Sequence, residues 1–273
     1  MRNPELAANR VLDELEIGGP EDLRELELLA FARGAMVRYS ELHGSEARIA
    51  MIGDRAVITV SSHVTRPQRR RFSVAHELGH LEMHRREAPL ILCVDDDLGA
   101  WQFGELAKDL EVQANQFAAS LLLPDRLIAP RIANAEPSIE HIVKLAEEFD
   151  TSLTATAIRY SQLTVEPVFV ALSQGGLVKW FWPSRFFQEL KEELQIYIET
   201  QVRLSPESLA ARVFSKGSSR AEAKQVPASA WLASDQLKPN ASVLEQCIPM
   251  PRYSAVLSLL WVNEEIDDDD ELF

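Results

Sequence analysis

The chain is poor in cysteine and has no long apolar run. Its 273 residues include two cysteines, Cys93 and Cys247, which lie far apart and form no CxxC pair. That count excludes a zinc site built from cysteines and gives no sign of a disulfide framework. No apolar run reaches the roughly 18 residues of a membrane-spanning helix. The N-terminal stretch MRNPELAANRVLDELE carries acids where a signal peptide needs an apolar core. We therefore expect a cytoplasmic protein that does not enter a membrane.

Basic residues are also in the minority. There are 28 lysines and arginines against 42 aspartates and glutamates, which gives a formal net charge of -14. The final stretch NEEIDDDDELF supplies half of that net charge. Because like charges repel and little apolar material anchors this run, we predict an acidic disordered tail over residues 263–273. The acidic remainder disfavours non-specific binding to nucleic acids, which depends on neutralising phosphates.

The remaining sequence has enough apolar residues, 46%, to form a core. Helical periodicity and turn signals predict a mostly helical first domain with a small sheet, over residues 1–165. The expected helices cover residues 21–35, 66–85, 104–123, 137–149 and 152–163, and the expected strands cover 36–42, 47–53 and 55–62. Thr65 and Gln68 have the form of a capping box. Residues 88–103, which include Pro89 and Gly99, are expected to form a loop.

The pattern changes after residue 165. Residues 167–182 predict a hairpin that turns at Gly175 and Gly176. Helices are expected to begin at Ser184, ending near residue 200, and at Ser205, and further strands are expected at 224–232, 241–250 and 253–262. We therefore predict an α+β protein whose second, smaller α+β domain, residues 166–262, contains an antiparallel sheet. A sensory domain of the GAF or PAS kind is compatible with this pattern, and partner binding is the default role.

The most informative stretch is FSVAHELGHLEMH, residues 72–84. His76 and His80 are one helical turn apart on one face, where two imidazoles can hold one Zn²⁺. Glu77 then lies beside the metal and can act as the base that activates a water molecule. The motif alone does not establish a zinc site, because catalytic zinc usually has three protein ligands.

The third ligand is not His84. It is eight residues after His76, about 12 Å along a helix axis, so these three histidines cannot converge on one ion. His84 is better interpreted as a supporting or packing residue. The single histidines elsewhere are better interpreted as surface or satisfied polar residues; they are His43, His63 and His141.

Glu111 is the better candidate. It falls in phase with the inward stripe of its helix, which comprises Ala107, Leu110, Ala114, Phe117, Ala118 and Leu121. A carboxylate on a buried face needs a cation or strong donors. Gly79, Ala114 and Ala118 would let the two helices approach closely, and Asn115 could orient the Glu111 carboxylate. The alternative is a salt bridge between Glu111 and a nearby arginine.

Three blocks of the sequence can be compared with known families: RRFSVAHELGHLEMHR, LEVQANQFAASLLLP and LAEEFDTSLTATAIRYSQLT. Together they resemble the ImmA/IrrE family of metallopeptidases over roughly residues 20–165. The resemblance implies a zincin-like domain in which His76, His80 and Glu111 hold zinc and Glu77 is catalytic. It also implies a protein substrate, a repressor of the Xre-like helix-turn-helix type that is cleaved in a stress or mobile-element response. Gln113 stands where the family often has an acid.

Two other functions remain open from the sequence. The first is a DNA-binding regulator, since residues 144–163 resemble a helix-turn-helix and arginines flank the HELGH motif. Against this function, Arg159 is the only cation on the presumed recognition helix. The arginines are better interpreted as a solvated face or a surface that steers an acidic partner. A zinc fold that binds partners without cutting them is the other. Tyr160 and Arg159 are candidates for stabilising an oxyanion by residue type only.

Overall fold

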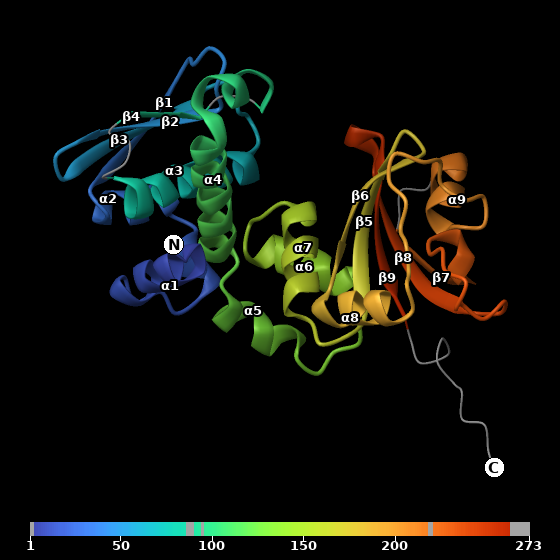
Figure 1. Ribbon diagram of the computed structural model, residues 1–273. Helices are drawn as coiled ribbons and strands as arrows, with labels where there is room; N and C mark the ends of the chain where they lie inside the picture. The colour runs from blue at the N-terminus through green and yellow to red at the C-terminus, as the bar shows by residue number, and fades with distance from the viewer. Residues whose placement is uncertain (1–2, 86–89, 94–95, 218–220, 263–273) are drawn as a thin grey trace. The chain divides into compact units, whose positions relative to one another are not determined.

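The computed structural model describes residues 3–85, 90–93, 96–217 and 221–262, and for residues 90–93 and 96–108 it describes the backbone alone. The predicted acidic tail, residues 263–273, lies outside the described residues. The fold is α+β, as predicted, with one sheet in each half of the chain (Figure 1). None of the helices in the described ranges has the length and apolar character needed to cross a bilayer.

Two compact units make up the chain. Unit 1 contains residues 1–127 and 146–152, and unit 2 contains residues 128–145 and 153–273. The boundary that we expected, between residues 165 and 166, would place residues 128–145 and 153–165 in the first domain. In the structure these residues cluster with the second sheet instead. The predicted boundary separates two folding domains, which the clustering of contacts does not test. It stays a prediction.

Unit 1 contains a four-stranded sheet in the order β1-β3-β2-β4. Its strands are β1 (Ala35–Ser40), β2 (Ala47–Ile52), β3 (Arg55–Ser61) and β4 (Leu90–Cys93). β1 runs parallel to β3, and the other pairs are antiparallel. The prediction of a loop over residues 88–103 was wrong, because residues 90–93 pair with β2 and a helix begins at Asp96. The apolar run LILC is too short to indicate a strand in the sequence, yet it forms an edge strand of this sheet.

The helices of unit 1 pack around this sheet and against each other. They are α1 (Pro4–Glu14), the 3₁₀ turn η1 (Pro20–Leu23), α2 (Leu26–Ala32), α3 (Pro67–His84) and α4 (Asp96–Leu122); α5 (Asp125–Ile132) leads into unit 2. The expected helix at 21–35 is split into η1 and α2, and Gly34, at φ 83°, follows the end of α2. The expected capping box was wrong, because the N-cap of α3 is Arg66 and has no side-chain cap hydrogen bond.

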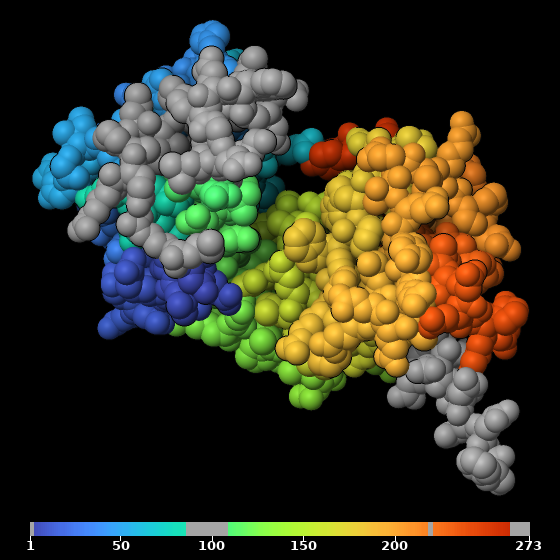
Figure 2. Space-filling model, in the orientation of Figure 1, coloured from blue at the N-terminus to red at the C-terminus, as the bar shows by residue number. Residues whose placement is uncertain are grey.

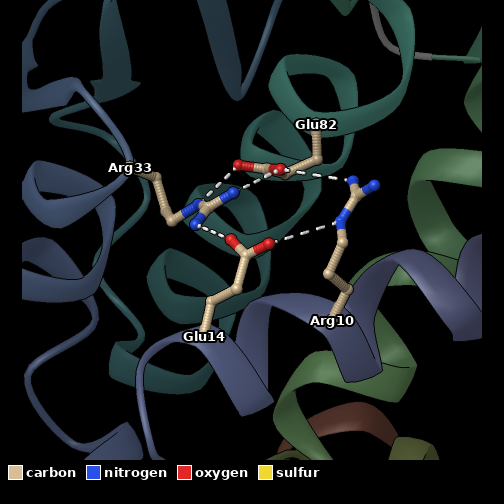
Figure 3. A network of polar contacts seen from close by, with 4 residues as sticks. All are labelled: Arg10, Glu14, Arg33 and Glu82. Carbon is tan, nitrogen blue, oxygen red and sulfur yellow. Dashed lines mark hydrogen bonds and ion pairs between the residues drawn. The ribbon is translucent and has the colours of Figure 1, made fainter.

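A ring of alternating charges joins α1, α2 and α3 (Figure 3). Arg33, at the end of α2, bonds to Glu82 of α3 at 2.8 Å and pairs with Glu14 of α1. Arg10 of α1 closes the ring at 3.8 Å from Glu82 and 4.0 Å from Glu14. Because these pairs bridge three helices, they hold α1 against the part of α3 that follows the HELGH motif.

Unit 2 contains a five-stranded antiparallel sheet in the order β6-β5-β9-β8-β7. Its strands are β5 (Val168–Gln174), β6 (Leu177–Pro183), β7 (Glu222–Pro227), β8 (Ser242–Met250) and β9 (Ala255–Trp261); its helices are α6 (Ile139–Glu148), α7 (Leu153–Leu163), α8 (Arg185–Glu193) and α9 (Leu209–Lys216). The helix from Ser184 ends seven residues earlier than expected. The segment from α8 to α9, gold to orange, covers much of the face of this unit seen in Figure 2.

Two neighbouring residues of β8 each hold the start of a helix. Glu245 is fully buried, and its carboxylate accepts hydrogen bonds from the backbone N–H groups of Leu209 at 2.7 Å and Ala210 at 2.9 Å, at the start of α9. Gln246 accepts from the N–H of Ile139 at 3.0 Å and donates to the carbonyl of Pro137 at 2.7 Å, at the start of α6. Successive strand residues point to opposite faces, so β8 anchors one helix on each side of the sheet.

Candidate metal centre

The HELGH motif lies in the buried part of α3. His76, Glu77 and His80 are all buried, and Glu77 and His80 have no exposed surface. The helical period places His76 and His80 on the same face, where their rings meet edge to face with centroids 4.8 Å apart. Burial on α3 removes these polar groups from water, so the fold must satisfy them from within.

A close approach of α3 and α4 brings the third residue to this face. A Cβ atom at Gly79 would lie 3.1 Å from the Cα and 3.2 Å from the carbonyl oxygen of Ala114, which leaves no room for an ordinary side chain. Phe117 would be equally close. The expected role of Gly79 and Ala114 in close helix packing therefore agrees with the geometry. α3 packs against α4 (Figure 1), and Glu111 lies one turn before Ala114.

The three predicted ligands converge. The Nε2 atom of His76 lies 3.0 Å from a carboxylate oxygen of Glu111, and the Nε2 atom of His80 lies 3.3 Å from the other oxygen. The two Nε2 atoms are 3.1 Å apart. All three residues belong to one group whose ligand atoms could hold a metal ion. These contacts pair Glu111 with two histidines and do not support the alternative of a salt bridge between Glu111 and an arginine.

Asn115 contacts a histidine rather than the carboxylate. Its Oδ1 atom lies 2.9 Å from Nδ1 of His76. An amide oxygen can only accept, so in this contact Nδ1 of His76 donates to Asn115. We expected Asn115 to orient Glu111. The structure places it on His76, because residues 111 and 115 are one turn apart along α4 and each meets a different part of α3.

His84 lies behind His80. Its Nδ1 atom is 3.0 Å from Nδ1 of His80, and its Nε2 atom is 3.3 Å from Oε1 of Gln113. Thus His84 contacts the side of the His80 ring that faces away from Glu111. This position agrees with the expectation that His84 supports the cluster and is not a ligand, and it adds Gln113 to the group.

The charges of the cluster shift its pKa values in the metal-free protein. Burial opposes the charged form of Glu111, but hydrogen bonds with His76 and His80 outweigh it and lower the pKa of Glu111 to about 2. Burial also opposes protonation of His76, but Glu111 and the nearby charge of Glu77 outweigh it, so the pKa of His76 is raised. For His80 burial dominates, and its pKa is lowered. An ionised carboxylate thus faces one imidazole that readily becomes cationic and one that resists protonation.

The other sequence candidates lie elsewhere. His43 and His63 are exposed and sit near Glu41, as expected of surface residues, and His141 is a half-buried residue of α6. Tyr160 is 1% exposed inside unit 2, and burial, the main cause, raises its pKa to about 12. Arg159 is buried and donates to Gln162. These contacts favour packing roles over oxyanion stabilisation.

The arginines that flank the motif serve the fold. Arg71 is buried and donates to the backbone carbonyls of Arg24 and Asp150. Arg69 pairs with Glu46 at 2.6 Å, and Arg70 donates to the carbonyl of Val64. The interpretation of a purely solvated, steering face was therefore wrong for Arg71, whose hydrogen bonds join α3 to the surrounding loops.

Comparison with known proteins identifies a metallopeptidase family. Residues 31–161 match the family described as the IrrE N-terminal-like domain (Peptidase_M78). The radiation response metalloprotease IrrE of Deinococcus radiodurans is 30% identical over 125 residues, which cover 44% of this chain and 35% of that protein. The protein of the same description from Deinococcus deserti is 31% identical over 121 residues, or 42% of this chain and 40% of that protein. The chain therefore matches well under half the length of these relatives.

A solved structure is similar over nearly the whole chain. The Mycobacterium tuberculosis transcriptional regulator aligns with a TM-score of 0.56 and 15% identity, covering 96% of this chain and 88% of that chain. At this identity the likeness concerns the fold alone. It extends over both units, whereas the family match ends within α7.

Proposed function

Since residues 31–161 of this chain belong to the ImmA/IrrE family of metallopeptidases, we propose that the protein is a zinc-dependent endopeptidase. The observation that carries the proposal is the convergence of His76, His80 and Glu111. In the proposal these three residues hold the metal, Glu77 is the catalytic base, and the site works in the cytoplasm.

The donor set fits zinc. Two imidazole nitrogens and one carboxylate are a common ligand set for catalytic zinc, which keeps a fourth position open. Ligand atoms about 2.0–2.2 Å from a tetrahedral ion lie about 3.3 Å apart. The two Nε2 atoms are 3.1 Å apart here, and they lie 3.0 and 3.3 Å from different oxygens of Glu111, so the three side chains already have nearly the spacing that an ion requires. The proton on Nδ1 of His76, held by Asn115, leaves Nε2 ready to coordinate.

Each residue has a distinct part in the proposed reaction. Zinc, when held by His76, His80 and Glu111, would supply a Lewis acid that polarises the scissile carbonyl and would lower the pKa of a water molecule to about 7. Glu77 would act as the base that accepts a proton from the attacking water and would pass it to the departing amine. Glu77 is fully buried, so its carboxylate is shielded from bulk water.

The proposed substrate is a protein, namely a transcriptional repressor of the Xre-like helix-turn-helix type. The family resemblance supports this choice. Direct binding to nucleic acid is not part of the proposal, since the net charge is -14 and Arg159 is buried.

The test compares the wild-type protein with Glu77→Gln. We expect about one zinc per chain in both proteins by elemental mass spectrometry, and cleavage of the partner by the wild type alone. The Glu77→Gln protein can serve to capture an intact partner from the native host, and the cleaved bond is then mapped by mass spectrometry. The same replacement at the exposed Glu147 is the control and should cleave normally.

Three outcomes would redirect the proposal. A wild-type protein without zinc contradicts the metallopeptidase assignment. Zinc without cleavage of any captured partner favours a zinc fold that acts by binding. A mobility shift of DNA that survives moderate salt favours a DNA-binding regulator.

A further inference from the structure

We propose that a groove between α1 and the end of α3 is a docking site for an acidic peptide segment of a protein partner. This α1–α3 groove lies within unit 1 and has a volume of about 760 Å³, inside the range of about 300–1,000 Å³ that is usual for ligand sites. The proposed metal ligands are not part of its lining, so the inference does not rest on the proposed function. The polar and exposed apolar residues that line it include Asn3, Leu6, Arg10, Arg33, Glu82 and Arg85.

The lining of the groove is cationic, although the chain as a whole is acidic. It contributes three arginines against one glutamate, whereas the whole chain has 28 basic and 42 acidic residues. Arg33 is already occupied, since its guanidinium donates to both oxygens of Glu82, at 2.8 and 2.9 Å, and pairs with Glu14. Glu82 and Glu14 together balance two of the three arginine charges, which leaves a net positive charge at the groove. Such a concave surface attracts groups of the opposite sign.

Arg10 and Arg85 keep hydrogen-bond donors available for a ligand. Arg10 makes ion pairs at 3.8 Å with Glu82 and 4.0 Å with Glu14, and its guanidinium has no hydrogen bond within the described part of the chain. Figure 3 shows one of its terminal nitrogens directed away from both glutamates. Arg85 donates from one nitrogen to the carbonyl of Gly53 at 3.3 Å. Because a guanidinium presents five N–H donors in a planar fork that matches a carboxylate, both arginines can bind an acidic side chain.

The side of α1 that lines the groove adds an apolar surface and a further donor. Asn3, Leu6 and Arg10 follow one another at helical spacing, over about 10 Å along the axis. Leu6 is 66% exposed, although it is a large apolar residue. Oδ1 of Asn3 caps α1 by accepting from the N–H groups of Glu5 and Leu6, so the NH₂ group remains as a donor.

This arrangement fits a peptide better than a free anion. A free anion needs several donors around one point, whereas here a cation, an apolar side chain and an amide are spread along α1. About three extended residues span the same 10 Å. A segment with an acidic residue at Arg10, an apolar residue on Leu6 and a backbone carbonyl at Asn3 matches the order of these groups. Arg85 offers a second contact for an acidic residue from the α3 side of the groove.

The experiment uses the full-length chain and a short fluorescein-labelled peptide of alternating glutamate and leucine residues. Fluorescence anisotropy measures binding in moderate salt, with and without added zinc. We expect saturable binding in both conditions, and much weaker binding of the same peptide with glutamine in place of each glutamate. Hydrogen exchange followed by mass spectrometry should show slower exchange over residues 4–14 and at the end of α3 when the peptide is bound.

Two arginine variants test the proposed contacts. Arg10→Gln and Arg85→Gln should each weaken binding about tenfold, because each removes a charge-assisted hydrogen bond to the peptide. Leu6→Ser should also weaken binding, since it removes the exposed apolar contact. The matched control is Arg55→Gln, an exposed arginine outside the groove, which should bind as the wild type does. Chemical denaturation of each variant checks that the free energy of unfolding has not changed.

Several results would overturn the inference. These are no binding at millimolar peptide, equal binding of the glutamine peptide, or an affinity that neither arginine variant lowers. Inorganic phosphate that displaces the peptide at equal concentration would show an unselective anion site, which also contradicts a peptide groove. Peptide binding does not need the metal, so a chain that binds the peptide but no zinc contradicts only the proposed function. A chain that binds zinc and cuts a partner, but does not bind the peptide, contradicts only this inference.

Discussion

Each unit of the molecule holds one glutamate among polar partners, and the two differ in exposure: Glu245 is fully buried, whereas the side chain of Glu111 is 39% exposed. Glu245 in unit 2 is surrounded by donors: two backbone N–H groups, the hydroxyl of Ser258 at 3.4 Å and the thiol of Cys247 at 3.2 Å. Glu111 in unit 1 faces two imidazoles instead, with its carboxylate oxygens 3.0 Å from Nε2 of His76 and 3.3 Å from Nε2 of His80.

The difference distinguishes a structural carboxylate from one that is suited to a ligand. The hydrogen bonds to Glu245 balance its burial and fix the start of α9, so no further partner is needed. At Glu111, the carboxylate and the Nε2 atoms of two histidines converge on one point. Such a group of ligand atoms can hold a cation. The two glutamates therefore differ both in exposure, 0% for Glu245 against 39% for the Glu111 side chain, and in the chemical nature of their neighbours.

The largest expected effect follows from replacing Glu111 by glutamine. The amide keeps the shape of the side chain but removes the charge and one acceptor, so zinc binding should weaken by more than the roughly 100-fold that outer partners control. The free energy of unfolding of the metal-free protein should also fall at neutral pH, because the contacts of the Glu111 carboxylate with His76 and His80 are lost. Chelator competition and chemical denaturation measure the two quantities. A variant that binds zinc normally would remove Glu111 from the ligand set.

The same replacement at Glu245 should lower stability without affecting zinc binding. In Glu245→Gln an NH₂ group must face one of the two backbone N–H groups, which loses a hydrogen bond and leaves a buried donor unsatisfied. We expect the free energy of unfolding to fall by about 1–3 kcal/mol, with zinc affinity unchanged. Together the two variants form a crossed test. If Glu245→Gln altered zinc binding and not stability, the contrast between the sites would be wrong.

The smallest expected effect concerns acid. In the metal-free protein the pKa of Glu111 is lowered from 4.5 to about 2, with burial outweighed by the hydrogen bonds to His76 and His80. Between these values the unfolded chain binds more protons at this residue, so its contribution to stability is present above pH 4.5 and is lost as the pH falls toward 2. Glu111→Gln should flatten the pH dependence of unfolding in that window. Equal slopes in both proteins would contradict the close contact with the histidines.

The proposed ligand residues could be predicted from the sequence because much of their arrangement follows from the helical period. The spacing of His76 and His80 and the phase of Glu111 along its own helix are fixed by 3.6 residues per turn. The contacts of Asn115 and Gln113 depend in addition on how far α3 and α4 are rotated against each other. That rotation is set by tertiary packing, such as the fit of Gly79 on Ala114, so the sequence pattern did not reveal these partners.

The structural glutamate and the edge strand were missed for related reasons. Strand alternation places Val243, Glu245 and Cys247 on one face, and the sequence does not indicate that the start of α9, more than thirty residues earlier, lies opposite. β4 is only four residues long, and its flanking proline and aspartates are typical of a loop. In both cases the deciding contact is distant in sequence.

The ring of charges that Figure 3 shows has a consequence for what counts as a domain here. Two of its members, Arg10 and Glu14, and the buried Val11 and Leu12 belong to α1, which precedes the family match at residue 31. A fragment cut at that residue would keep every proposed ligand and lose the helix that braces Glu82, two residues beyond His80. The family match therefore begins later in the chain than the residues that pack together. Activity measured on a fragment that starts at residue 31 would describe a site without the support of α1.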